Sequence, residues 1–139
     1  MNLYVLDTDT LSLHEKDHPQ VKLSVDAHMA DDLAITVMSV EEQLAGWYRQ
    51  LRKNQPTVQL AQVYLRLVQC VRSYARWRLL EFNVAAIQRL QQLKRLKLNV
   101  AGFDLAIAAI ALEHGGILVS RNLRDFQRVP GLLVEDWSV

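Results

Sequence analysis

The sequence predicts an α/β fold, in which a central, mostly parallel sheet of about four or five strands is flanked by helices on both faces. Short, nearly continuous apolar runs alternate along the chain with longer stretches whose apolar residues recur at helical spacing. Continuous apolar runs are typical of strands that are buried on both faces of a sheet. The chain has 139 residues, half of them hydrophobic, so we expect residues 1–139 to form one domain with one sizeable core.

Five short runs are expected to form the strands. They cover residues 3–6, 33–37, 78–82, 117–120 and 132–134. The first run ends at Asp7, and the fourth is followed by Arg121 and Asn122. In parallel α/β sheets the reactive groups lie beyond the carboxyl ends of the strands, so these positions are the expected site.

Longer stretches between these runs are expected to form the helices. They cover about 18–29, then Ser39 to Pro56, and about 57–77, 84–96 and 101–114. Proline cannot continue a helix, which explains the boundary at Pro56. The stretch 101–114 is the most apolar and stops at the pair Gly115–Gly116.

The composition excludes several classes of protein. With Cys70 as the single cysteine, neither an intramolecular disulfide nor a cysteine-rich zinc site can form, which suits a reducing compartment. The apolar run at the N-terminus is interrupted by Asp7 and lacks a basic flank, so it does not read as a signal peptide. No uncharged apolar stretch has the length of a membrane span. We therefore expect a cytoplasmic protein that has no membrane partner.

The net charge of +1 conceals a strong segregation of charge along the chain. Residues 1–42 carry 2 basic and 9 acidic side chains, a net charge of −7. Residues 43–103 carry 11 basic side chains and 1 acidic one, a net charge of +10, and residues 104–139 carry 3 and 5, a net charge of −2. The basic middle section favours either a polyanionic partner such as RNA or simply a solvated helical face.

Four acidic residues stand at the expected ends of strands or starts of helices, and each has a purely structural explanation. Asp7 is a suitable helix N-cap, and Glu42 completes an S-x-x-E capping box that begins at Ser39. Asp104 lies where a helix dipole stabilises a negative charge, and Asp125 is a turn residue with arginines beside it. Taken alone, Glu42 is best explained as a cap.

Taken together, the four carboxylates suggest a site for a catalytic metal ion. Clustered carboxylates without His or Cys partners suit a hard divalent cation such as Mg²⁺ or Mn²⁺. Such a cation can lower the pKa of a bound water and stabilise the charge that develops on a phosphodiester.

Three segments carry a resemblance to a known family. They are YVLDTDTLSL, ITVMSVEEQLAGW and AGFDLAIAAIALEHGGILVSRNLRDFQRVPGLLVEDW. Together they resemble the PIN-domain ribonucleases, and among these the VapC toxins of type II toxin–antitoxin modules. By position, the resemblance implies that the catalytic acids are Asp7, Glu42, Asp104 and Asp125.

The resemblance also assigns more specific roles. It implies that Asp7 and Asp104 bind the metal, with Glu42 and Asp125 as further candidate ligands. Three polar residues are expected beside the ligands, namely Asp9, Ser120 and Asn122. Asn122 competes with Asp125 for the fourth position of the site, and Asp9 is a departure, because the family commonly has Asn there.

The activity implied by the resemblance is Mg²⁺- or Mn²⁺-dependent endonucleolytic cleavage of RNA, with tRNA as a candidate substrate and arrest of translation as the outcome. The implied partners are a VapB-like antitoxin and a second copy of the chain in a homodimer. The basic middle section then supplies candidate contacts to RNA phosphates: Arg49, Arg52, Lys53, Arg66, Arg72 and Arg76.

Two other functions remain open at this stage. The run Leu6-Asp7-Thr8-Asp9-Thr10 satisfies the D-x-D-x-T opening of haloacid-dehalogenase-like phosphatases, with Asp7 as nucleophile and Asp9 as acid/base. Such an enzyme also needs a suitably placed lysine, and the chain has none after Lys97. The second possibility is a catalytically silent PIN domain that only binds RNA or a partner.

Overall fold

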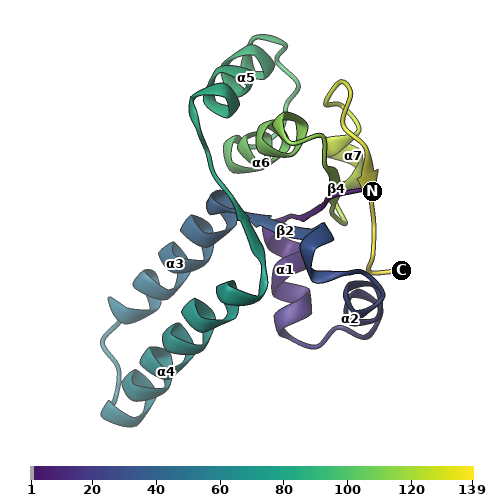
Figure 1. The fold of residues 1–139 in the computed structure, drawn as a ribbon. Helices are drawn as coiled ribbons and strands as arrows, with labels where there is room; N and C mark the ends of the chain where they lie inside the picture. Colours follow the sequence, from purple (N-terminus) through teal and green to yellow (C-terminus); the bar gives the residue numbers. More distant parts are fainter. Residues whose placement is uncertain (1) are drawn as a thin grey trace.

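The computed structural model describes residues 2–139, in which a five-stranded sheet lies between two layers of helices (Figure 1). The strands are β1 (Tyr4–Leu6), β2 (Leu33–Thr36), β3 (Arg78–Leu80), β4 (Ile117–Val119) and β5 (Val134–Glu135). Their order in the sheet is β3-β2-β1-β4-β5, and every neighbouring pair is parallel. This confirms the predicted α/β class and places β1, the strand that leads into Asp7, at the centre.

Seven α-helices and two short 3₁₀-helices connect the strands within residues 2–139. The α-helices are α1 (Thr8–Glu15), α2 (Pro19–Asp26), α3 (Val37–Leu51), α4 (Thr57–Ser73), α5 (Val84–Arg95), α6 (Gly102–Glu113) and α7 (Leu123–Phe126). The 3₁₀-helices are η1 (Ala30–Asp32) and η2 (Tyr74–Arg76). No helix in this part of the chain is long and apolar enough to cross a membrane.

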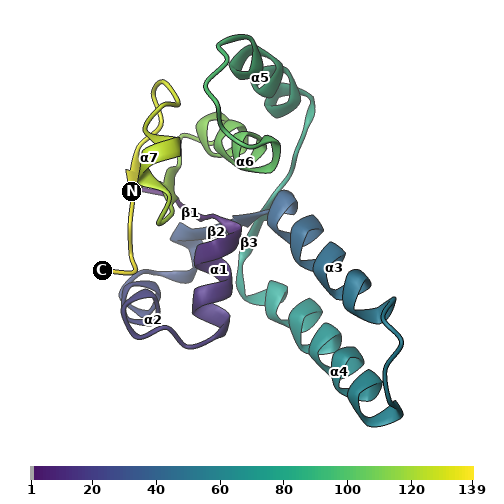
Figure 2. The ribbon, with the colours of Figure 1, turned by 180° about the vertical axis from the view of Figure 1, so that it is seen from behind.

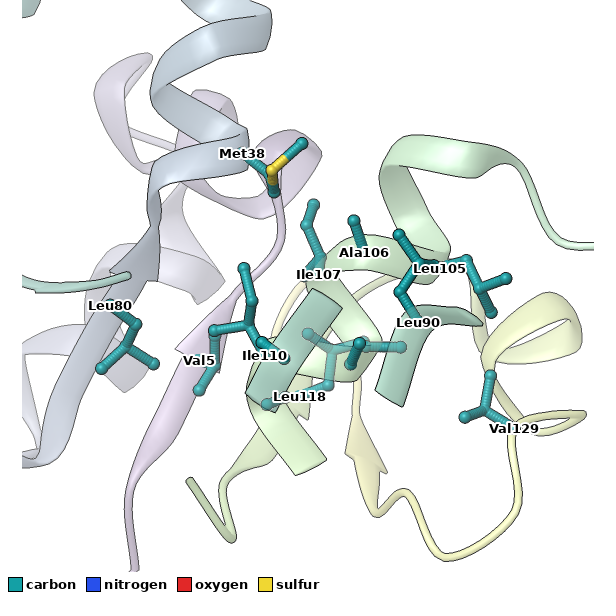
Figure 3. Close-up of a cluster of buried hydrophobic side chains, with 14 of the residues drawn as sticks. Val5, Met38, Leu80, Leu90, Leu105, Ala106, Ile107, Ile110, Leu118 and Val129 are labelled. Atoms are coloured by element: carbon teal, nitrogen blue, oxygen red, sulfur yellow. The ribbon is translucent and has the colours of Figure 1, made fainter. Parts of the chain in front are cut away.

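Successive strand residues alternate between two apolar clusters, one on each face of the sheet. Val5 and Leu118 belong to the cluster that packs against α5 and α6. Figure 3 shows side chains of this cluster. Their neighbours Leu6 and Val119 belong to the other cluster, which packs against α1 and α2. The two views of the ribbon show these helix pairs on opposite sides of the sheet (Figures 1 and 2).

Helix α6 lies between the sheet and α5, which explains why it is apolar on all sides. Its residues from Leu105 to Ala111 are all buried. A helix with this composition needs partners on every face, and it holds Asp104 in its first turn on a rigid support.

Helices α3 and α4 form a hairpin that extends away from the sheet (Figures 1 and 2). Only Met38 and Ser39 of α3 and Cys70 of α4 are buried. Several large apolar side chains of the hairpin are exposed, namely Tyr48, Val58, Tyr64, Leu65, Val68 and Val71. The hairpin therefore offers an apolar surface that the rest of the chain does not cover.

The structure corrects several expected boundaries. Helix α3 begins at Val37 rather than at Ser39, and it ends at Leu51, before Pro56 is reached. The stretch expected as one helix over 57–77 ends as a helix at Ser73 and continues as η2. Helices α1 and α7 were not predicted, because neither shows a helical spacing of apolar residues in the sequence. Helix α1 buries only Thr10 and Leu11, and α7 has a single turn.

Candidate active site

A cavity of about 560 Å³ opens at the carboxyl end of the sheet, where the sequence placed the site. Its lining comes from α1, α3, α6 and the segments that follow β1 and β4. The lining residues are Asp7, Thr8, Asp9, Ser12, Glu42, Asp104, Arg121 and Asn122. Three of the four expected catalytic acids thus share one cavity, although they lie far apart in the sequence.

Asp7 is held firmly at the base of this cavity. Its backbone N–H donates to the Val119 carbonyl at 3.0 Å, and its side-chain Oδ1 accepts from the Thr10 N–H at 2.8 Å. The side chain is therefore the N-cap of α1, as the structural explanation proposed, and it also lines the cavity. Burial of all but 4% of its surface raises the pKa of Asp7, while Ser120 and Thr10 oppose the shift.

Glu42 is not a capping residue, so the capping-box interpretation is wrong. The N-cap of α3 is Thr36, whose hydroxyl accepts from the Ser39 N–H at 3.4 Å. Glu42 instead reaches across to α1, where Thr8 Oγ1 donates to its Oε1 at 2.6 Å. The Thr8 and Ser39 hydroxyls lie 2.9 Å apart, so a short hydroxyl chain holds the Glu42 carboxylate in the cavity.

Asp104 carries the clearest electrostatic signature of the site. Burial, together with the charges of four other acids, raises its pKa to about 6; these acids are Asp7, Glu42, Asp125 and Asp9. The side chain lies in the first turn of α6, whose N-cap Ala101 makes no side-chain cap hydrogen bond. The cavity thus holds more negative charge than its own residues balance, as expected of a site built for a cation.

Asp125 is not among the residues that line the cavity, but it contacts one of them. Its Oδ2 accepts from Asn122 Nδ2 at 2.9 Å, and its Oδ1 accepts from Arg128 Nη1 at 3.1 Å. Asn122 does line the cavity, and its backbone N–H donates to the buried Ser120 hydroxyl at 2.9 Å. Of the two candidates for the fourth position, Asn122 is therefore the one whose side chain borders the space directly.

Arg121 also lines the cavity, as expected for the segment after the fourth strand, although its side chain had been assigned no role. Its Nε and Nη2 donate to Asp9 Oδ2 at 2.7 Å and to Asp9 Oδ1 at 2.9 Å. The only signal for it in the sequence is its position immediately after β4, in the segment 120–122.

The chemistry of this donor set fits a divalent cation. The acids supply hard oxygen ligands, and burial together with repulsion from the neighbouring acids raises the pKa of Asp104. Within residues 2–139, no three His, Cys, Asp or Glu side chains are already arranged so that all of them could hold one metal ion. A cation that retains most of its water, as Mg²⁺ does, needs only one or two direct carboxylate ligands.

The six basic residues expected to contact RNA lie elsewhere. All six are exposed on or near the α3–α4 hairpin, and none lines the carboxylate cavity. Arg66, Arg72 and Arg76 instead line a separate cavity together with Trp47 and Trp77. Arg76 is also paired with Asp26 at 3.7 Å.

Known proteins share the sequence pattern and the fold. A model of the PIN domain family matches residues 4–132. The tRNA(fMet)-specific endonuclease VapC of Salmonella typhimurium is 41% identical over 46 residues, which cover 33% of this chain and 35% of that protein. The tRNA(fMet)-specific endonuclease VapC of Shigella flexneri is 40% identical over 63 residues, which cover 42% of this chain and 48% of that protein. The matched segments thus span less than half of these curated relatives.

The fold has a close counterpart among solved structures. A chain in the crystal structure of DNA-bound VapBC from Salmonella typhimurium superposes with a TM-score of 0.78 at 24% sequence identity, over 99% of both chains. At this identity the likeness concerns the fold alone. The family match, by contrast, covers nearly the whole chain and includes Asp7, Glu42, Asp104 and Asp125. The chain therefore belongs to the PIN domain family.

Proposed function

We propose that this PIN-domain protein is the toxin of a type II toxin–antitoxin module, an endoribonuclease that depends on Mg²⁺ or Mn²⁺ and arrests translation by cutting RNA. The observation that carries the proposal is the convergence of Asp7, Glu42 and Asp104 on one cavity whose negative charge is not balanced. Two relatives with local identity of 40% and 41% are named tRNA(fMet)-specific endonucleases, which supports a tRNA substrate.

Each acid has a distinct part in the proposed site. Asp7 and Asp104 hold the metal ion, with Glu42 and Asp125 as further candidate ligands. When bound, the cation lowers the pKa of a water molecule and offsets the charge that develops on the phosphodiester. Thr8 donates a hydrogen bond to Glu42 and fixes the direction of its carboxylate, while the Ser120 hydroxyl accepts from the Asn122 N–H in the segment after β4. Hard oxygen ligands favour Mg²⁺ or Mn²⁺ over softer metals.

The exposed apolar surface of the hairpin suits protein partners. A VapB-like antitoxin and a second copy of the chain are the partners we propose for the apolar side chains that α3 and α4 leave uncovered. The exposed arginines of the same hairpin, with Lys53, are proposed to contact RNA phosphates beyond the cavity. The solved structures of similar fold include VapBC complexes, which supports an antitoxin partner.

The phosphatase alternative is not favoured, because the PIN family model matches residues 4–132. In addition, both carboxylate oxygens of Asp9, its expected acid/base, accept hydrogen bonds from Arg121. No observation favours a catalytically silent domain, since all four acids of the pattern are present.

The test is to incubate the purified protein with total RNA, and separately with initiator tRNA, in Mg²⁺, in Mn²⁺ or in EDTA. We expect discrete fragments that require the metal ion and disappear in the Asp7→Asn variant. A matched control is Asp31→Asn, which removes an exposed carboxylate remote from the cavity and should cut normally. Intact RNA together with release of phosphate from a small monoester would refute the proposal.

A further inference from the structure

One basic side chain, that of Arg121, lines the carboxylate cavity within the described residues 2–139. Its guanidinium is tied to Asp9 by two parallel hydrogen bonds of 2.7 and 2.9 Å. Asp9 lies on α1, whereas Arg121 follows β4, and 112 positions separate the two residues in the sequence. The pair therefore joins two walls of the cavity that belong to opposite ends of the chain.

Stability does not account for this ion pair. The two side chains are 50% and 48% exposed, and a pair exposed to this degree contributes little to the stability of the fold. A bidentate arrangement does, however, fix the plane and direction of the guanidinium. Asp9 therefore acts on the orientation of Arg121 much more than on the stability of the fold.

Arg121 retains unused hydrogen-bonding capacity. A guanidinium has five N–H groups, and Asp9 engages one on Nε and one on Nη2. The remaining three, two on Nη1 and one on Nη2, make no hydrogen bond within residues 2–139 and can donate to a further acceptor. Planar donors of this kind match the oxygens of a phosphate.

The charges around Arg121 identify the ligand class. Apart from Arg121, every charged residue that lines the cavity is acidic, namely Asp7, Asp9, Glu42 and Asp104. An RNA backbone that enters this space meets repulsion except where it meets a cation. Arg121 is the cation that the chain itself supplies there.

We propose that Arg121 binds a backbone phosphate of the RNA beside the phosphodiester that is cut, and that Asp9 is a positioning residue that directs its guanidinium. The inference rests on the proposed ribonuclease function, because it requires RNA to enter the cavity.

The first experiment measures RNA affinity by fluorescence anisotropy with labelled initiator tRNA in Mg²⁺. Every protein carries Asp7→Asn so that the RNA stays intact. We expect Arg121→Ala to raise the Kd about tenfold and to reduce the slope of log Kd against log salt by about 0.7 to 1. The matched control is Arg124→Ala, which removes an equal charge from an exposed arginine outside the cavity lining and should change the Kd less than about twofold. Equal effects of the two variants, or no effect of Arg121→Ala, would overturn the proposal.

The second experiment tests the positioning role of Asp9 by a double-mutant cycle. Asp9→Asn removes a negative charge, so electrostatics alone predicts tighter RNA binding whether or not Arg121 is present. The proposal predicts that Asp9→Asn weakens binding about threefold when Arg121 is present and does not weaken it in the Arg121→Ala background. The same change in both backgrounds would refute a positioning role.

Catalytic measurements separate this inference from the proposed function. In the protein with Asp7 intact, Arg121→Ala should raise KM while kcat changes much less, because the lost contact acts on binding. RNA binding that depends on Arg121 without any cleavage would refute the ribonuclease and leave the phosphate contact standing. Metal-dependent cleavage with an unchanged KM in Arg121→Ala would refute the contact and leave the ribonuclease standing.

Discussion

Replacing Asp104 by Asn should stabilise the metal-free protein while it abolishes cleavage. The fold raises the pKa of Asp104 from 3.8 to about 6, so the ionised carboxylate opposes folding at neutral pH. At about 1.4 kcal/mol per pKa unit the penalty is at most about 3 kcal/mol. Screening by solvent at this partly exposed side chain, and a favourable helix-dipole contribution of about 0.3–1 kcal/mol, reduce it to about 1–2 kcal/mol.

The sign of the pH dependence follows from the direction of the shift. Well above pH 6 the native state carries the full penalty, because Asp104 is then ionised in both the folded and the unfolded chain. As the pH falls from about 6 towards 3.8, the folded protein takes up the proton first, and the penalty disappears. The advantage of Asp104→Asn over the wild type should therefore be greatest at neutral pH and vanish near pH 4.

The assay is urea or thermal unfolding in EDTA at pH 7 and at pH 4.5, followed by circular dichroism. A gain of about 1–2 kcal/mol corresponds to a rise in Tm of about 3–7 °C for a domain of this size. Asp31→Asn removes a carboxylate from an exposed position and should change stability by less than about 0.5 kcal/mol. A lower stability of Asp104→Asn at pH 7, or a gain that does not depend on pH, would refute the electrostatic reasoning.

Four further outcomes follow from the structure. Glu42→Gln keeps an oxygen that can accept from Thr8, so the free energy of unfolding, measured by melting curves, should change by no more than about 1 kcal/mol. Metal-dependent cleavage, measured by kinetics, should fall at least about tenfold. Thr8→Val removes the donor to Glu42 and should cost about 1 kcal/mol together with a smaller loss of kcat, measured on the same tRNA. Gly116→Ala would bring a Cβ to 2.9 Å from Val5 Cγ2 and should destabilise the protein by about 1–3 kcal/mol in urea unfolding, with unchanged stability as the contrary result. RNA binding should weaken at least about tenfold between about 50 and 200 mM salt, and affinity that is insensitive to salt would argue against phosphate contacts by the basic hairpin.

The sequence was sufficient to predict the sheet and the acids at its carboxyl end. Short apolar runs reveal strands of a parallel sheet because both faces of each strand are buried, as for Leu118 and Val119 in β4. Asp7 could be placed because it directly follows such a run, and Asp104 because it begins the most apolar helix.

Side-chain partners could not be predicted, because they depend on tertiary contacts between distant segments. The S-x-x-E pattern at Ser39 suggested a cap for Glu42, but β2 continues to Thr36, which caps α3 in its place. The true partner of Glu42 is Thr8, 34 positions away. Arg121 and Asp9 are farther apart still, and no local pattern relates them.

The order of the strands determines when the site comes into existence. Central β1 pairs with β2 on one side, but its other neighbour, β4, begins only at Ile117. A chain growing from its N-terminus on the ribosome therefore carries Asp7 beside an unpaired strand edge until most of the sequence has emerged. Asp104 joins it only when α6 has been made and can pack on the sheet. Under the proposed function, a nascent chain that has not yet made α6 and β4 therefore lacks the assembled carboxylate site.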